Sequence, residues 1–276
     1  MSRVSESRVE YGVIGAGALS KSLIGHLPRK VREIGPVAGV SYRVASRMTN
    51  ALRAGHAARG PDELNSVPVI LFHAPDGQMR QIAALLEGAG IDWKDKSLIF
   101  CDCEVPVSIL DRFRALGAAT AEARQFGIAG AIMVEGTPPA LGRALRIASE
   151  LKLRAIEIEP GTSDVFAATV TLATAALTPL VNRAANLLRR CGLRDKAAVD
   201  VATALFERSI QEYGHSGKQS WVWHVREPEA EQIQAEIAAV EESFRPLFRQ
   251  LVLAGFEDFE KHADVAHQLR GTAQAR

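Results

Sequence analysis

Hydrophobic positions in the first half of the chain form short runs that alternate with stretches of helical periodicity. Short apolar runs bounded by glycine or polar residues are typical of strands buried on both faces of a parallel sheet. Such runs occur at residues 9–14, 37–41, 68–73, 97–101, 131–134 and 155–158. Helical spacing of apolar residues occurs at residues 18–27, 79–86 and 139–151. Because strands that alternate with helices need crossover connections, this pattern predicts an α/β fold with a parallel sheet.

The second half of the chain has a different pattern, with three predicted helices and no strand between them. These helices cover residues 164–191, 195–213 and 229–259, and residues 271–276 are predicted to fray. The apolar stretch from Val165 to Val181 contains several threonines and is shorter than the ~20 residues of a bilayer span, which predicts a buried helix. We therefore expect two domains, an α/β domain at 1–160 and an all-α domain at 161–276.

Composition narrows the class of protein. A hydrophobic content of 47% and a charged content of 24% are typical of folded soluble proteins. The net charge of +1, with both signs interspersed, argues against nucleic acid as the main partner. Three cysteines and a polar amino terminus without an apolar core argue against a secreted, disulfide-linked scaffold. We expect a cytoplasmic protein that does not bind a membrane.

A glycine-rich turn follows the first predicted strand and opens the first predicted helix. Its sequence is Gly15-Ala16-Gly17-Ala18-Leu19-Ser20. In this context Gly15 supplies the tight turn, Gly17 lets the backbone approach a pyrophosphate, and Ser20 is small enough for close packing of helix and strand. The first domain is thus predicted to be a Rossmann dinucleotide-binding domain. The alternative is that the two glycines only make a tight connection.

The end of the second predicted strand indicates which dinucleotide would bind. A site for NAD usually places a carboxylate there, whereas this strand ends in Ser41-Tyr42-Arg43, and Arg47 follows. Ser41, Arg43 and Arg47 could bind the 2′-phosphate of NADP(H), although both arginines could instead be solvated surface residues.

The predicted strand at residues 68–73 is followed by Ala74-Pro75-Asp76. In folds of this kind, ligands bind at the carboxyl ends of the strands, where these residues lie. The carboxylate of Asp76 could contact the cofactor or cap the following helix.

These features together resemble the pyrroline-5-carboxylate reductase and β-hydroxyacid dehydrogenase clan. The likeness is strongest to the Rossmann-like NADP oxidoreductases with a helical carboxyl-terminal domain. It implies NADP(H) as cofactor, a homodimer formed through the helical domains, and a small-molecule substrate bound beside the first long helix. In the reductase branch a Ser or Thr on that helix positions or protonates an imine, which points to Thr171 and Thr174. The hydroxyacid branch places a Lys and an Asn there, and no such pair precedes Asn182.

A proton donor is the other requirement of such chemistry. His215 and Lys218 lie in a glycine-containing stretch predicted to connect two helices, where functional groups concentrate, although exposed loop residues are more often solvated. Cys101 and Cys103 follow a predicted strand, so their segment should face the nicotinamide end of the crevice. Without further ligands at matched spacing they predict buried structural cysteines rather than a metal site.

The sequence therefore predicts an NADP(H)-dependent oxidoreductase that reduces a C=N or C=O bond of a small substrate. One alternative is a regulatory or sensing protein that binds NADP(H) without catalysis, since this chain has Phe166 where the related oxidoreductases often have a histidine. Another is a scaffold protein that dimerises through its helical half.

Overall fold

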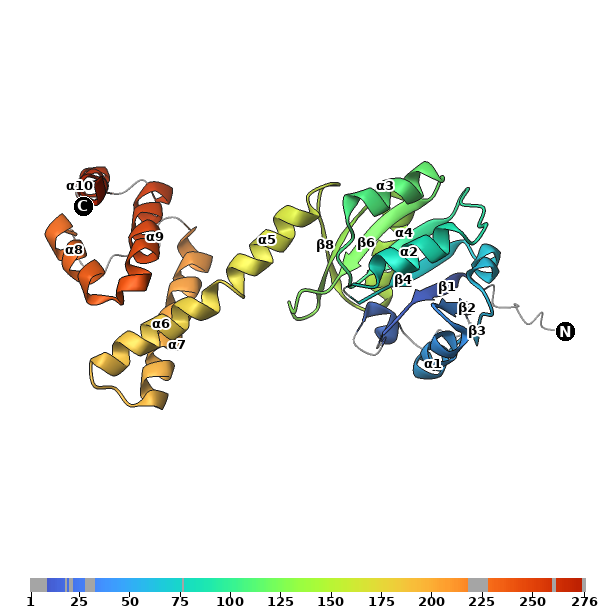
Figure 1. Cartoon of the computed structure of the whole chain (residues 1–276), viewed down its shortest axis with the longest axis horizontal. Coiled ribbons are helices and arrows are strands. Elements are labelled where there is room, and N and C mark those ends of the chain that lie inside the picture. Colours follow the sequence, from blue (N-terminus) through green and yellow to red (C-terminus); the bar gives the residue numbers. More distant parts are fainter. Residues whose placement is uncertain are drawn as a thin grey trace. The chain divides into compact units, whose positions relative to one another are not determined.

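The computed structural model describes residues 9–17, 19, 22–27, 33–75, 77–217, 228–259 and 262–274. The chain folds as two compact units, Met1–Val170 and Thr171–Arg276. The first contains a central sheet with helices, and the second contains only helices and turns in its described part (Figure 1). The predicted fold class, a Rossmann-type sheet followed by a helical half, is confirmed.

One eight-stranded sheet forms the centre of the first unit, in the order β3-β2-β1-β4-β5-β6-β7-β8. The strands are Tyr11–Gly15 (β1), Ile34–Gly39 (β2), His56–Ala57 (β3), Val69–His73 (β4), Ser97–Cys101 (β5), Ala119–Arg124 (β6), Ala131–Gly136 (β7) and Arg154–Glu157 (β8). All neighbouring strands are parallel except β6 and β7, which are antiparallel. Because the strand order reverses between β1 and β4, a crevice opens there at the carboxyl ends of the strands.

Two of these strands, β3 and β6, have no counterpart in the sequence prediction. β6 reads ATAEAR, in which alanine alternates with polar or charged residues. Alanine and glutamate have a low intrinsic preference for strands. The segment is a strand because it pairs with β5 on one side and β7 on the other, so its tertiary environment decides its conformation.

Hydrophobic cores lie on both faces of the sheet. On one face, α2 (Met79–Glu87) and α3 (Val107–Ala115) bury a cluster that includes Phe72 and Phe100, whose ring centroids are 4.9 Å apart. On the other face lie α1 (Tyr42–Leu52) and α4 (Pro138–Glu150). Helix α3 was absent from the sequence prediction. It covers the sheet at β6, where the site described below lies.

The first connection after β1 differs from the helix predicted at residues 18–27. Among the residues described there, the regular element is a 3-10 helix, η2, at Leu23–His26. The Ser22 hydroxyl donates a hydrogen bond to the carbonyl of Leu19 at 3.0 Å, and side-chain bonds of this kind compete with a regular helix. Gly25 lowers helix propensity further.

The second unit contains five helices within its described residues besides the end of α5. They are α6 (Leu177–Arg190), α7 (Asp195–Ser216), α8 (Ala230–Ala239), α9 (Arg245–Asp258) and α10 (Ala263–Gln274). Helices α8, α9 and α10 share a core around Ile233, Phe256 and Leu269. The frayed tail predicted from residue 271 is wrong up to Gln274, because α10 continues to that residue and packs on this core.

Two of the three predicted long helices are broken. The one predicted at residues 164–191 turns between α5 (Ser163–Ala173) and α6, where the Ala176 amide donates to the Thr171 carbonyl at 2.9 Å. The one predicted at 229–259 breaks at Val240, which has an extended backbone, and Pro246 lies in the first turn of α9. Proline lacks the amide donor that a helix interior needs, so it favours a new helix start.

Helix α5 also differs from its prediction as a buried helix, because none of its residues is buried within the chain. The run Ser163–Arg190 is long and apolar enough, by length and composition, to cross a membrane. The structure divides it into two helices at residues 174–176.

Substitution of Gly15, the last residue of β1, tests how closely β1 and β4 approach each other. A Cβ at position 15 would lie 2.0 Å from the carbonyl oxygen of His73, and β1 is fixed there by its pairing with β4. We expect Gly15→Ala to lower the free energy of unfolding by about 3 kcal/mol or more, measured by urea denaturation. The matched control is Gly142→Ala in α4, where a Cβ meets nothing within 4 Å, and it should stabilise by about 0.5–1 kcal/mol. Equal stability of the two variants would contradict this account.

Candidate functional site

The glycine loop after β1 is held against the end of β4. The amide of Ala16 donates to the carbonyl of His73 at 3.0 Å, and Gly17 has a φ of +90°. A Cβ on Gly17 would make an ordinary contact of 3.4 Å with the ring of Pro75, so the positive φ is what favours glycine here. The predicted loop residues Ala18 and Ser20 and the neighbouring Asp76 lie outside the described residues, and the side chains of Ala16 and Leu19 are buried.

The end of β2 places three predicted residues at the start of α1. Ser41 is the N-cap of α1, and its hydroxyl accepts a hydrogen bond from the Val44 amide at 3.4 Å. Arg43 and Arg47 are four residues apart on α1, and both are exposed. Within the described part of the chain neither arginine has an ion-pair partner. Both guanidinium groups can therefore bind an anion at the end of β2.

Asp102, directly after β5, connects the glycine loop to the end of β6. One of its carboxylate oxygens accepts a hydrogen bond from the Leu23 amide at the start of η2, and the other accepts one from the Gln125 amide at 2.7 Å. Asp102 itself has a φ of +50°, a left-handed conformation that aspartate tolerates better than most residues. This side chain fixes the segments after β1 and β6 to each other through the end of β5.

The flanking cysteines are not reactive groups of this edge of the sheet, although the Cys101 carbonyl oxygen lies 2.9 Å from Nδ1 of His73. Cys101 and Cys103 are buried, as predicted, and burial raises the pKa of Cys103 to about 12. A thiol with that pKa stays protonated at neutral pH and is a poor nucleophile. Among the described residues no group of His, Cys, Asp and Glu could hold a metal ion.

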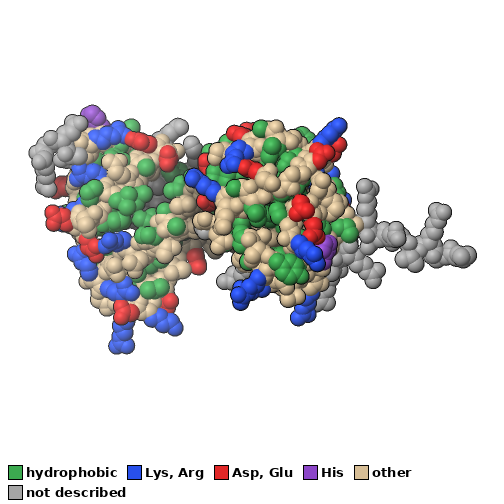
Figure 2. All heavy atoms as spheres, turned by 45° about the vertical axis from the view of Figure 1, so that its right-hand side comes forward, with side chains coloured by type: hydrophobic (Ala, Val, Ile, Leu, Met, Phe, Trp, Pro, Cys, Tyr) green, Lys and Arg blue, Asp and Glu red, His purple; other side chains and the backbone are tan. Residues whose placement is uncertain are grey.

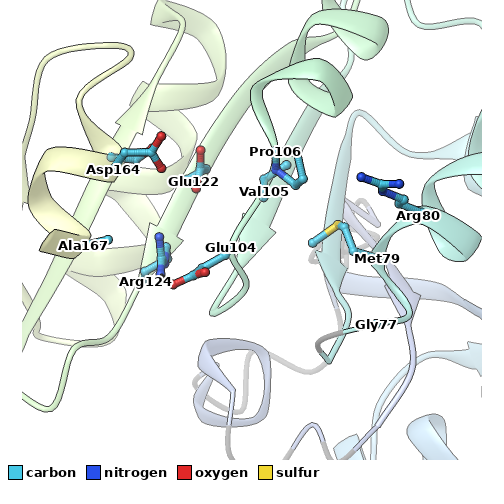
Figure 3. A pocket seen from close by; sticks show the side chains of 11 residues that line it. Gly77, Met79, Arg80, Glu104, Val105, Pro106, Glu122, Arg124, Asp164 and Ala167 are labelled. Atoms are coloured by element: carbon cyan, nitrogen blue, oxygen red, sulfur yellow. Dashed lines mark hydrogen bonds and ion pairs between the residues drawn. The ribbon is translucent and has the colours of Figure 1, made fainter. Parts of the chain in front are cut away.

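A pocket of about 450 Å³ opens at the carboxyl ends of β5 and β6, within the first unit. Its apolar lining comes from Met79, Val105, Pro106 and Ala167, and its charged lining from Arg80, Glu104, Glu122, Arg124 and Asp164 (Figure 3). The segments after β4 and β5, the end of β6 and the first turns of α5 contribute these residues. The pocket and the glycine loop therefore lie along the same edge of the sheet.

The charged side chains of this pocket differ in their partners, since Arg124 has an ion-pair partner and Glu122 has no hydrogen-bond partner among the described residues. Arg124 forms an ion pair with Glu104 at 3.0 Å, and its guanidinium lies 4.9 Å from the ring centroid of Phe126. Glu122 and Asp164 line the same pocket, and the charge of Arg124 acts on Glu122 more strongly than that of Asp164 does. Glu122 is only 2% exposed, and neither of its carboxylate oxygens has a hydrogen-bond partner among the described residues. Burial, and secondarily the neighbouring Glu135, raises the pKa of Glu122 to about 7.

Among the described residues, none of the predicted catalytic residues lines this pocket. Thr171 and Thr174 belong to the second unit, at the end of α5 and in the turn that follows it. His215 lies in the last turn of α7 rather than in a loop, because the helix continues to Ser216, and its Nδ1 lies 2.8 Å from the Gln211 carbonyl oxygen. Lys218 lies outside the described residues.

Sequence reasoning missed the charged residues of the pocket. Glu122 and Arg124 lie in β6, which the hydrophobic pattern did not identify. The available signal was the alternation of alanine with charged residues between Ala119 and Arg124, which is a strand pattern with one polar face. Asp164 was considered only as the first residue of a helix.

Comparison with known proteins supports the fold. No family profile matches the sequence, and no curated protein matches it. A candidate NADP oxidoreductase from Bacteroides fragilis has 14% identity and a TM-score of 0.68, over 92% of this chain and 99% of that one. An imine reductase from Myxococcus stipitatus in complex with NADP⁺ has 14% identity and a TM-score of 0.61, over 96% and 94%.

A reductive aminase from Aspergillus terreus, in complex with NADPH and ethyl levulinate, has 13% identity and a TM-score of 0.56, over 97% of this chain and 93% of that one. These likenesses extend across both units. At such low identity they show a shared fold, and the fold implied by the sequence resemblance is confirmed.

The raised pKa of Glu122 predicts how stability depends on pH. Its folded-state pKa of about 7 lies above its ordinary value of 4.5, so the native state binds more protons between these values. Stability should therefore fall as pH rises through this window. Glu122→Gln removes the charge and keeps the shape. We expect this variant to gain roughly 2–3 kcal/mol relative to the wild type between about pH 5 and pH 8, measured by urea denaturation.

The control for this measurement is Glu157→Gln, on the edge strand β8, where the carboxylate is exposed. Its stability difference from the wild type should not change over the same pH range. A constant difference for Glu122→Gln would show that Glu122 titrates normally.

Proposed function

We propose that this protein is an NADP(H)-dependent oxidoreductase that reduces a C=N or C=O bond of a small substrate. The observation that carries the proposal is the placement of two features along one edge of the sheet. A glycine loop with the conformation needed for close backbone approach lies at the ends of β1 and β4. A pocket large enough for a small molecule lies beside it at the ends of β5 and β6.

The residues present fit a dinucleotide phosphate. Gly17 lets the backbone approach a pyrophosphate without a side chain in the way, and the crevice at the strand-order reversal is where such ligands bind. Arg43 and Arg47 supply the charge for a 2′-phosphate at the end of β2. Ser41 can contribute its hydroxyl, although in this structure that group also caps α1.

The chemistry divides between the cofactor and the pocket. When bound, a reduced nicotinamide supplies the hydride. The pocket must orient the acceptor carbon, exclude water and provide a proton. Met79, Val105 and Pro106 form an apolar wall for this purpose, and Glu122, whose carboxylate oxygens have no hydrogen-bond partner among the described residues, lines the same pocket. The imine reductase and the reductive aminase that share this fold support a C=N substrate.

The cofactor proposal is tested by comparing affinities for NADPH and NADH. Replacing both Arg43 and Arg47 with alanine should weaken NADPH binding at least about tenfold, since a hydrogen bond to a charged group contributes about 1.5–3 kcal/mol. NADH lacks the 2′-phosphate, so its affinity should change little. Fluorescence titration measures both. Arg154→Ala on β8 is the control and should leave both affinities unchanged. An equal loss for NADPH and NADH would contradict a 2′-phosphate site.

We further propose that the protein is a homodimer assembled through its helical half. Figure 2 shows hydrophobic side chains gathered on the helical unit and bordered by charged ones. Leu172 is 70% exposed, and on α7 Val201 and Leu205, four residues apart, are 40% and 55% exposed. Large exposed apolar side chains on neighbouring turns favour burial against another protein surface.

The association state tests this second proposal. Analytical ultracentrifugation should give a dimer for the wild type and a shift to monomer for the double variant Val201→Asp, Leu205→Asp, because burying carboxylates in an interface is unfavourable. Leu116→Asp, at an exposed apolar position of the first unit, should remain dimeric. A monomeric wild type would rule the proposal out.

A further inference from the structure

Two buried glutamates face each other across the antiparallel strands at the base of the pocket. Glu122 of β6 and Glu135 of β7 are register partners, and they are 2% and 3% exposed. Directly opposite residues of an antiparallel pair lie on the same face, with Cβ atoms about 4.5–5.5 Å apart. The two carboxyl groups are therefore neighbours below the pocket.

Their hydrogen bonding is asymmetric. Oε1 of Glu135 accepts a hydrogen bond from the Gly161 amide at 2.6 Å, which fixes this side chain to the segment before α5. The other oxygen of Glu135 and both oxygens of Glu122 have no partner in the part of the chain that the structure describes. Glu122 also lines the pocket, whereas Glu135 does not. Glu122 is thus the member of the pair that forms part of the pocket wall.

The surroundings of the pair favour the protonated form of Glu122. Two carboxylates buried side by side cannot both ionise without a large penalty. Burial and Glu135 raise the pKa of Glu122, and Asp164 at the start of α5 raises it further. Arg124 and Arg114 oppose the shift, but Arg124 is paired with Glu104, and Arg114 is bound to Thr120 and Asp111.

Two further titratable groups lie near the pair or line the same pocket. Cys103, in the segment after β5, interacts electrostatically with Glu122. The raised pKa of the Cys103 thiol keeps this thiol neutral. Arg80 of α2 lines the pocket without an ion-pair partner among the described residues. Such a pair does not stabilise the fold, because buried polar atoms without hydrogen-bond partners lower the free energy of unfolding. Apolar side chains at the same positions would not have this effect.

We propose that Glu122 is the catalytic acid of the proposed reduction and that Glu135 is a positioning residue that keeps the proton on Glu122. This inference rests on the proposed function. The O–H bond of Glu122 breaks as an N–H bond forms to the lone pair of the imine nitrogen, which gives an iminium ion and leaves Glu122 as a carboxylate that solvent reprotonates. As hydride adds to the carbon of this C=N bond, the π electron pair moves to nitrogen and becomes the lone pair of the neutral amine.

The position of the acid also indicates the substrate class. An imine nitrogen is far more basic than a carbonyl oxygen, so a carboxyl group that titrates near neutral pH protonates it readily. The resulting iminium cation would lie between Glu122 and Asp164, two carboxyl groups of the pocket that lack an arginine partner in the described ion pairs. The structure therefore favours a C=N compound over a ketone or aldehyde.

The direct test compares a cyclic imine with its N-methylated iminium salt, which needs no protonation. With NADPH at about pH 7, Glu122→Gln should lower kcat/KM for the imine by about 100-fold or more, the usual contribution of a general acid. For the iminium salt the variant should stay within about threefold of the wild type. Glu157→Gln on β8 is the matched control and should behave as wild type with both substrates.

A measurement without cofactor supports or overturns the same assignment. In protein with ¹³C-labelled glutamate side chains, one NMR signal should titrate near neutral pH and disappear in Glu122→Gln. The same signal should titrate at lower pH in Glu135→Gln, because the neighbouring negative charge is gone. If no glutamate titrates above its ordinary range, the proposal is wrong.

The outcomes distinguish a failure of the Glu122 assignment from a failure of the proposed function. If the wild type reduces imines and Glu122→Gln reduces them equally well, Glu122 is not the acid and the proposed function stands. If the wild type reduces no substrate of a panel of imines, keto acids and amine-plus-carbonyl pairs, the proposed function fails and the assignment of Glu122 fails with it.

Discussion

The backbones of β1 and β4 approach each other so closely at Gly15 that no side chain fits between them. The site for a Cβ is taken by the carbonyl oxygen of His73, and the same oxygen accepts the amide of Ala16. The contact fixes where the chain leaves β1, and Gly17 then turns beside Pro75. A loop held on one side by the sheet and free of side chains on the other is suited to a phosphate group, since its backbone amides can approach the ligand.

The same edge of the sheet tolerates buried carboxyl groups that a purely structural core would exclude. Three of the four strands from β4 to β7 are apolar over most of their length, whereas β6 places Thr120, Glu122 and Arg124 on one face. Alanines occupy its other face and pack into the core beneath α4. One face of β6 therefore packs into the hydrophobic core, and its other face forms a charged wall of the pocket.

The sequence was sufficient for the fold class and insufficient for the pocket. The apolar runs of β1, β4 and β5 and the glycine loop follow from local pattern, because strands buried on both faces must be apolar. β6 could not be found this way, since its alanines and charges have little strand preference and pairing with β5 and β7 fixes them. The break at residues 174–176 was missed because backbone bonds in a turn leave no hydrophobic signal, whereas Pro246 was an available signal for the break at residue 240. His215 was placed in a loop because Gly214 and Gly217 flank it, yet only Gly217, with its φ of +54°, ends the helix.

Asp102 explains how the glycine loop and the pocket can act as one site although they lie on different strands. Its two oxygens hold the amides of Leu23 and Gln125, which follow β1 and β6. A displacement of the segment at Leu23 would disturb one of these bonds and strain a residue that already has a left-handed backbone. Gln125 directly follows Arg124, and Arg124 is two residues from Glu122. A single side chain at the end of β5 therefore joins the segment after the glycine loop to the segment that follows the pocket strand β6.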